Sequence, residues 1–465
     1  KRHPGIKKRY LFANLRKITR FYGILLLAKN IIAFEGVFMD KFVDESRKWY
    51  RLDNAAKIYP VVITIKESHV FRVSMTLKEE VNPEILQKAV EMCQNRFPTF
   101  YVKMKPGLFW YYFEPNEKKP IVKPEPARIC QPIVLHENNN YFFTIYYYQK
   151  RISLEVFHGL CDGTGAMEFL KAICFQYLVL QGHQLSPEGL VRTIGEVPTF
   201  SETEDSYLRY YTKEKGKPLP TDKSFKIKGT RLAVYGSSVI KGKIDSRAIY
   251  QLAKSKNATV TEFLVALLTY SVIQFNDPTE MAKRPISICI PVNMRRHFPS
   301  ETIRNFALFF HTIYRFKSKD VTFDEVLQDI KQSFKERLTK DDLQKKLNLN
   351  VGIEKKFIVR IMPLFLKKIM MKFGYHFFGS RPTTVTISNL GVVRLPESMK
   401  PYVEEVEFNL GSGGIPSVAV ATYEDYTILS FSRGYYETDL EYHFFKFLTE
   451  QGLEVEIQSN LWEQN

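Results

Sequence analysis

Cysteine is scarce in this chain: five occur among 465 residues, and no two form a CxxC pair. An odd number of unpaired cysteines supports neither a disulfide framework nor a thiolate zinc site, so we predict no bound metal. Because disulfides are rare in reducing compartments, we expect a cytoplasmic protein. The five are Cys93, Cys130, Cys161, Cys174 and Cys289.

Acidic residues are absent from positions 1–20, which hold eight lysines and arginines. The whole chain has 67 basic and 50 acidic side chains, a net charge of +17. Leu11, Leu15 and Ile18 are spaced as on one helix face, and we predict a basic amphipathic arm over residues 1–45. Three interpretations stay open: a helix docked on its own domain, peripheral contact of residues 1–28 with an anionic membrane, or a signal peptide.

Long hydrophobic runs are also missing. Lys29, Asn30 and Glu35 interrupt the apolar stretch 21–39, so we expect no spanning helix there, and a mean hydropathy of −0.23 argues against a multi-span membrane protein. The absence of a fixed-period repeat excludes solenoids and coiled coils. No zinc finger, RNA-recognition signature or basic helix-turn-helix is present, and we expect no nucleic-acid partner.

What is present indicates a globular protein, because 45% of the residues are hydrophobic, including 36 Phe and 26 Tyr. Apolar density is high over 49–180, falls over 182–230, where prolines and charges gather, and rises again from 232. We therefore predict a linker or crossover at 182–231 that separates an N-terminal lobe, 46–181, from a C-terminal lobe, 232–465.

Strands and helices are predicted in both lobes without strict alternation, so each lobe is expected to be a mixed sheet covered by helices. Thr259 with Glu262, and Thr322 with Glu325, have the spacing of helix capping boxes. The predicted strands are 61–65, 70–77, 141–147, 152–158, 286–292, 384–388, 418–422 and 427–432. The predicted helices are 83–96, 166–180, 261–275, one from 322, 355–372 and 440–450.

The segment that carries chemistry is 157–165, FHGLCDGTG, between a predicted strand and a predicted helix. An imidazole held rigidly at a strand end can remove a proton from a hydroxyl near neutral pH, which makes His158 a candidate general base. Asp162 can fix the loop by pairing with a cation, and Thr164 is a candidate helix cap. The alternative is a core histidine, because His158 lies in phase with the apolar residues of its strand.

His158, Asp162 and Gly163 match the HxxxDG motif, and three further segments match in the same order. These are WYRLD at 49–53, PVNMR at 291–295 followed by Asn305 and Phe306, and SNLG at 388–391. The chain thus resembles the superfamily of chloramphenicol acetyltransferase, condensation domains of peptide synthetases and alcohol acetyltransferases, and most of all the bacterial alcohol acetyltransferase-like proteins. The resemblance implies an α+β fold of two chloramphenicol acetyltransferase-like lobes around an interlobe tunnel.

The resemblance also implies roles for individual residues. His158 would be the general base, Asp162 with Gly163 would shape its loop, and Arg295, or else Arg296, would pair with Asp162. Asn293 belongs to the supporting motif. Ser388 and Asn389 would either line the tunnel or merely shape a strand-end turn.

Two departures from the family pattern concern activity and substrate. Phe157 replaces the first histidine of the doublet that many relatives have, although the second histidine carries the chemistry. The DFGWG loop of the plant acyltransferases is absent, and NLGSGGIP at 409–416 is only a loose echo of it.

The function implied is a coenzyme A-dependent O-acyltransferase that moves an acyl group, most simply acetyl, to a small-molecule alcohol. Acyl-CoA would be a co-substrate, and no permanently bound cofactor is expected. Two alternatives stay open: an N-acyltransferase or condensation-type enzyme that uses a carrier-protein thioester, and a catalytically silent binding or membrane-associated member. We expect a free-standing enzyme, because no carrier or adenylation segment is recognisable.

Other conspicuous residues carry no motif. His311 and His376 lie in aromatic runs and are predicted to be structural, as is Cys161 in the motif loop, and His443 has no motif around it. The basic residues of 355–372 would either meet the phosphates of coenzyme A or form a solvated helix face. They are Lys355, Lys356, Arg360, Lys367, Lys368 and Lys372.

Overall fold

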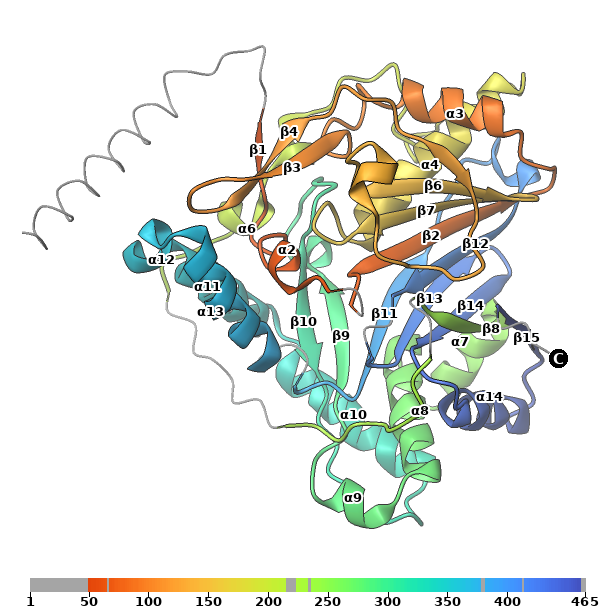
Figure 1. Cartoon of the computed structure of the whole chain (residues 1–465). Helices are drawn as coiled ribbons and strands as arrows, with labels where there is room; N and C mark the ends of the chain where they lie inside the picture. The colour runs from red at the N-terminus through yellow and green to blue at the C-terminus, as the bar shows by residue number, and fades with distance from the viewer. Residues whose placement is uncertain are drawn as a thin grey trace, which may run out of the picture.

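The computed structural model describes residues 49–64, 67–214, 223–232, 236–377, 381–411 and 414–460. Within these ranges the strands form sheets of five, seven and three strands, with helices packed around them (Figure 1). The predicted α+β fold with two mixed, helix-covered sheets is confirmed. The predicted arm, residues 1–45, lies outside the described residues.

The five-stranded sheet has the order β12-β2-β7-β6-β5. Its strands are β2 (Val70–Leu77), β5 (Val122–Pro124), β6 (Phe143–Tyr148), β7 (Arg151–Phe157) and β12 (Val403–Leu410). Only β5 and β6 run parallel; the other neighbours are antiparallel. The helices α3 (Pro83–Met92) and α4 (Gly163–Leu180) lie on one side of this sheet (Figure 1).

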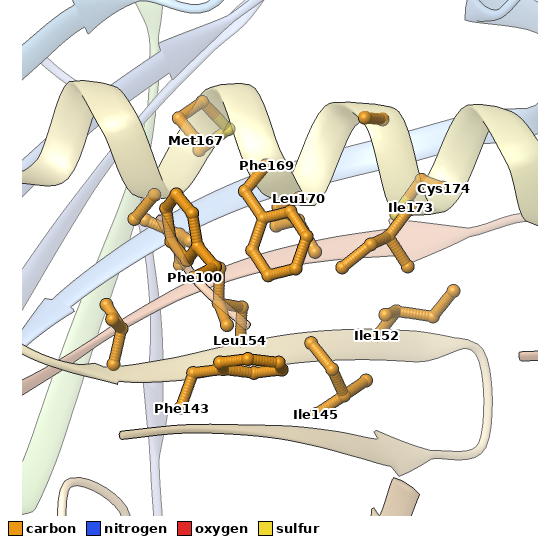
Figure 2. Close-up of a cluster of buried hydrophobic side chains, with 14 of the residues drawn as sticks. Phe100, Phe143, Ile145, Ile152, Leu154, Met167, Phe169, Leu170, Ile173 and Cys174 are labelled. Atoms are coloured by element: carbon orange, nitrogen blue, oxygen red, sulfur yellow. The ribbon is translucent and has the colours of Figure 1, made fainter. Parts of the chain in front are cut away.

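Helix α4 is held on this sheet by an aromatic and aliphatic core. Alternation along β6 turns Phe143 and Ile145 toward the helix, where they meet Phe169 and Ile173 (Figure 2). The rings of Phe169 and Phe100 lie 4.3 Å apart between centroids. This packing fixes the start of α4 relative to the end of β7, and therefore fixes the loop between them.

The seven-stranded sheet has the order β10-β9-β11-β13-β14-β8-β15. Its strands are β8 (Ser238–Asp245), β9 (Ile288–Asn293), β10 (Ala307–His311), β11 (Val385–Val392), β13 (Ser417–Tyr423), β14 (Tyr426–Arg433) and β15 (Val455–Ser459). Strand β11 runs parallel to both of its neighbours, β9 and β13, and the remaining pairs are antiparallel.

Helix α8 (Val260–Phe275) is the central helix of the second lobe, and its residues are buried almost all round. It packs against α7 (Ser246–Ser255), α10 (Phe323–Arg337) and α14 (Asp439–Glu450). The capping boxes predicted for α8 and α10 are both present. In the described part of the chain, no single helix is long and apolar enough to span a membrane; α7 and α8 qualify only as a pair bent by 80°.

Strand β12 crosses between the lobes. It lies in the predicted C-terminal lobe, yet it pairs antiparallel with β2, Phe408 opposite Val73, and its Val406 and Phe408 join the core of the first lobe. An ion pair of 2.7 Å between Lys241 of β8 and Glu407 ties it to the second sheet. The boundaries 46–181, 182–231 and 232–465 stay a prediction. The sheet of the first lobe is nevertheless completed by β12, which lies within 232–465.

The remaining elements lie around the two main sheets. The third sheet joins β1 (Tyr50–Arg51), β4 (Tyr111–Pro115) and β3 (Val102–Pro106). The other helices are α2 (Tyr59–Val62), α5 (Phe200–Thr203), α6 (Ser206–Arg209), α9 (Pro278–Ala282), α11 (Lys340–Lys355), α12 (Phe357–Ile361) and α13 (Leu364–Tyr375). Short 3-10 helices are η1 (Leu135–Asn138), η2 (Met294–Arg296) and η4 (Lys400–Tyr402).

Two predicted elements are wrong. The strand expected at 61–65 is replaced by the short helix α2, which has Pro60 in its first turn, where a fixed φ and a missing N–H cost nothing. The single helix expected over 355–372 is broken into the end of α11, then α12 and α13. Pro363 immediately precedes α13 and cannot donate the hydrogen bond that a continuous helix needs.

Candidate active site

His158 is held at the end of β7 by its own backbone and by two aromatic rings. Its N–H donates to the carbonyl of His69 at 2.9 Å. The imidazole stacks on Tyr59, with centroids 4.6 Å apart and planes 16° apart, and meets Phe71 edge-on at 5.1 Å. The inward-facing residues of β7 are fully buried, whereas His158 stays partly exposed. The ring is therefore fixed in orientation without being sealed in the core.

Asn305 and Asp53 decide which nitrogen of His158 carries the proton. The Nδ1 atom lies 3.0 Å from Oδ1 of Asn305, whose Nδ2 donates to Oδ2 of Asp53 at 3.2 Å. A carboxylate only accepts hydrogen bonds, so the amide nitrogen must face Asp53 and the amide oxygen must face the imidazole. His158 Nδ1 is then the donor, and Nε2, which has no hydrogen-bond partner among the described residues, keeps its lone pair.

Burial lowers the pKa of His158, against the opposing effects of the nearby Asp162 carboxylate and the Asn305 hydrogen bond. An imidazole with a lowered pKa is neutral at physiological pH. Together with the tautomer set by Asn305, this makes Nε2 a base ready to accept a proton.

Asp53 is fully buried, and Arg304 lies beside it. Its Oδ1 accepts from the N–H of Ala56 at 2.7 Å, and Nε of Arg304 lies 3.7 Å from its Oδ2. Burial raises the pKa of Asp53, while the Arg304 guanidinium favours the ionised form. The carboxylate is thus part of a row that runs from Arg304 through Asp53 and Asn305 to His158.

Asp162 ties the histidine loop to the second lobe. It caps α4 by accepting from the N–H of Gly165 at 3.1 Å. Its other oxygen accepts from Nη1 of Arg295 at 2.7 Å and from the N–H of Phe306 at 2.8 Å. Of the two arginines weighed as partners, the structure places Arg295 on Asp162. None of these contacts involves the imidazole, so Asp162 holds the loop.

Arg295 donates further hydrogen bonds through Nε to the carbonyl of Thr302 at 2.9 Å, through Nη2 to the carbonyl of Arg304 at 2.6 Å and through Nη1 to Oδ1 of Asn293 at 3.3 Å. Asn293 caps η2 by accepting from the N–H of Arg295 at 3.0 Å, and its Nδ2 donates to the hydroxyl of Thr164 at 3.1 Å. Asn293 and Arg295 therefore both bridge the second lobe to the start of α4.

Gly163 and Gly165 allow α4 to approach the second lobe. A Cβ at Gly165 would lie 1.9 Å from the carbonyl oxygen of Ile303, and one at Gly163 would lie 2.8 Å from Cδ2 of Leu390. The first clash is with backbone and cannot be relieved by a rotamer change. Gly165, which had no assigned role in the sequence interpretation, is therefore the stricter requirement of the two.

Ser388 and Asn389, near the end of β11, differ in the hydrogen bonds that their side chains make. Asn389 donates to the hydroxyl of Thr261 at 3.2 Å and accepts from the N–H of Gly391 at 2.7 Å, across a register shift between β11 and β13. Its amide is thus used by the turn. Ser388 is partly exposed, and its hydroxyl has no hydrogen-bond partner among the described residues, so that hydroxyl stays available.

This chain is similar to a known protein family and to several solved structures. The family model for alcohol acetyltransferase matches residues 233–421. No curated protein sequence matches significantly. Among solved structures, the trichothecene 15-O-acetyltransferase TRI3 from Fusarium sporotrichioides is 10% identical, with a TM-score of 0.54, over 86% of this chain and 94% of that one.

Two other solved structures are similar in the same way. TRI101 of F. sporotrichioides, complexed with coenzyme A and T-2, is 11% identical with a TM-score of 0.54, over 89% of this chain and all of that one. The first condensation domain of the calcium-dependent antibiotic synthetase is 11% identical with a TM-score of 0.55, over 88% and 99%. This chain has the fold of the two-lobed HxxxDG acyltransferases. The predicted resemblance is confirmed, and the alcohol acetyltransferase match agrees with the predicted acyltransferase.

Within this acyltransferase fold, Asn305 and Asp53 are the residues whose roles sequence reasoning missed. Both stood in recognised segments, but nothing in those segments shows that they meet each other and His158. A third missed feature is His69, which has a positive φ of 50° and a buried Nε2 without a hydrogen-bond partner among the described residues. Its ring lies between Tyr59 and Tyr375, 5.6 Å from each.

The other residues singled out in the sequence have structural surroundings. Cys161 is fully buried, and burial raises the pKa of its thiol, so it is no nucleophile. His311 hydrogen-bonds the hydroxyl of Thr383 at 3.1 Å, and His443 stacks on Phe275. The described residues contain no group of three or more His, Cys, Asp or Glu side chains arranged to hold a metal.

Proposed function

We propose that the protein is an acyl-CoA-dependent O-acyltransferase that acylates a small-molecule alcohol, most simply with an acetyl group. One observation carries the proposal: His158 is partly exposed, with its tautomer set so that Nε2 is a free base. The family match to alcohol acetyltransferases supports a hydroxyl acceptor, and the similarity to TRI101, which was solved with coenzyme A, supports the donor.

In the proposed reaction, a proton moves from the alcohol to His158 and then from His158 to the leaving sulfur. Nε2 of His158 takes the hydroxyl proton while the oxygen forms a bond to the thioester carbonyl carbon. The tetrahedral intermediate then expels the thiolate as the C–S bond breaks, and the imidazolium returns the proton to sulfur. An ester and free coenzyme A result, and His158 is neutral again.

General-base assistance accounts for about 10²–10⁴ of the rate, so positioning and stabilisation of the developing oxyanion must supply the rest. The Ser388 hydroxyl is our candidate for a polar contact with the substrate, because it has no other partner in the described residues. Asn389 is not, since the turn occupies its amide.

Two earlier expectations remain proposals. A cytoplasmic location is supported by the free, buried state of all five cysteines. Membrane contact through residues 1–28 has no support from the comparisons, and those residues lie outside the described part of the chain.

The decisive experiment replaces His158 by Ala and by Gln and measures thiol release from acetyl-CoA with a panel of alcohols. We expect kcat to fall by about 10²–10⁴ while binding of acetyl-CoA, measured by calorimetry, is kept. His136→Gln is the matched control, because its side chain is 83% exposed and away from the site.

Undiminished turnover in a folded His158 variant would refute the base assignment. The same panel includes amines and an acyl carrier protein thioester, so that a preference for either would replace the O-acyltransferase proposal by the N-acyltransferase or condensation-type alternative. Absence of heat on adding acetyl-CoA to the wild-type protein would point instead to a catalytically silent member.

A further inference from the structure

Helices α12 and α13 expose an unusual density of large apolar side chains, a surface that we call the α12–α13 face. Ile358 is 70% exposed, Phe365 65% and Phe373 61%. On α13 the exposed apolar residues recur at i, i+1, i+4, i+5 and i+8, which is one continuous helix face. The members of the α12–α13 face are Phe357, Ile358, Phe365, Leu366, Ile369, Met370, Phe373 and Phe377.

The opposite side of α13 is anchored in the protein. Leu364 is buried, and its N–H donates to the carbonyl of Leu108 at 2.9 Å. Lys367 is also buried: its Nζ donates to the carbonyl of Phe109 at 2.9 Å and lies 3.9 Å from the ring centroid of Trp110. The α12–α13 face is therefore presented outward by a helix that is held from behind, and Lys367 is not part of it.

Charge on the α12–α13 face has one sign. No acidic residue occurs between Lys355 and Pro396 in the sequence. Lys356, Arg360 and Lys372 are exposed, and none has an ion-pair partner among the described residues. The nearest preceding acid, Glu354, is already paired with Lys57 at 2.5 Å.

A contiguous exposed apolar patch marks a surface that another apolar body covers. Here that body must also be negatively charged, because the apolar residues are flanked by unpaired cations. A second copy of this face would bring cations against cations. Residues 1–20 have no acid either, so charge equally disfavours that segment of the N-terminal arm as its cover.

We propose that the α12–α13 face docks the protein on an anionic lipid surface. Its exposed Phe, Ile, Leu and Met side chains would enter the boundary of headgroups and acyl chains, while Lys356, Arg360 and Lys372 meet anionic headgroups. Helix α13 ends at Tyr375, whose ring packs on His69 beside the candidate active site, so docking holds the site close to the lipid. The proposal does not depend on the chemistry of His158.

The test is flotation of the full chain with phosphatidylcholine vesicles, with or without phosphatidylglycerol. We expect binding to the anionic vesicles that weakens as salt is raised. Ile358→Asp, Phe365→Asp and Phe373→Asp combined should reduce binding at least about tenfold, and Lys356→Gln, Arg360→Gln and Lys372→Gln combined should abolish the preference for phosphatidylglycerol.

Two controls keep the proposal falsifiable. Val197→Asp with Phe200→Asp changes side chains that are 84% and 82% exposed outside this face and should leave binding unchanged. Lys7→Gln, Lys8→Gln and Arg9→Gln test the arm. Binding that survives the α12–α13 aspartates, or that is lost only with the arm substitutions, overturns the proposal.

Sedimentation velocity tests whether a second copy of this chain, rather than a lipid surface, covers the α12–α13 face. We expect wild type and the triple aspartate variant to have the same sedimentation coefficient. A dimer of the wild type that the aspartates dissociate would show that a second copy covers this face, and would overturn the lipid proposal. Thermal melts of both variants check that they are folded.

Discussion

At the scale of single residues, the candidate active site depends on an amide placed between a carboxylate and an imidazole. Asn305 has no chemistry of its own in the proposed reaction, and it touches no reacting atom; it is a positioning residue. Asn305 acts through the orientation of its side chain: Asp53 fixes the orientation of the amide, and the amide fixes the tautomer of His158.

This arrangement predicts a pH profile. Burial lowers the pKa of His158, so kcat/KM should rise with pH through a midpoint below about 6.5 and be constant at neutral pH. In Asn305→Asp, a second carboxylate faces the imidazole and favours its charged form, which should move that midpoint to higher pH. An unchanged midpoint in a folded, active variant would mean that Asn305 does not act through His158.

Asn305→Ala is the companion variant. Loss of the acceptor for Nδ1–H should lower kcat by roughly 5- to 150-fold, the equivalent of about 1–3 kcal/mol for one buried polar contact, with a smaller effect on KM. Steady-state kinetics with acetyl-CoA separate the two constants.

At the scale of elements, the start of α4 packs so closely on the backbone of residue 303 that a side chain at Gly165 has no space. Gly165→Ala should destabilise the protein by about 1–3 kcal/mol or more, because its Cβ would lie 1.9 Å from a backbone carbonyl and α4 would have to move. Gly352→Ala in α11 is the control: its nearest neighbour would be 4.0 Å away, and helix propensity predicts a gain of about 0.5–1 kcal/mol.

Denaturant titration measures both changes. A Gly165→Ala protein as stable as the wild type would show that the contact between α4 and the 303 carbonyl is looser than its geometry implies. Activity would then be expected to survive as well, since the loop of His158 is anchored on the same turn.

At the scale of the whole molecule, β12 makes the two lobes interdependent. A fragment of residues 1–231 lacks this strand, so one edge of β2 is left unpaired and Val406 and Phe408 are missing from the first core. We expect the fragment to show no cooperative thermal unfolding by circular dichroism. Co-expression with residues 232–465 should restore it, and a cooperative transition in the fragment alone would contradict this interpretation.

Much of the architecture could be predicted from local pattern. The strand at 70–77 was predicted at its observed bounds, and the capping boxes at Thr259 and Thr322 marked the starts of α8 and α10. The sequence did not predict strands β1, β3, β4, β5, β8, β10, β12 and β15. Of these, β1, β5 and β15 are short edge strands, and an exposed edge strand has weak alternation. One continuous helix was predicted over 355–372 from its run of basic residues. The break at Pro363, between α12 and α13, was missed.

Motifs and helix caps are built from near neighbours along the chain, so the sequence alone predicted the superfamily resemblance, the loop of His158 and the residue types at Asp162 and Arg295. The remaining contacts could be seen only in the folded protein. Asn305 meets His158 across 147 positions and Asp53 across 252, and β12 joins a sheet whose other strands are all in the first lobe. Such contacts depend on how two lobes pack, and packing at that distance leaves no periodic trace along the chain.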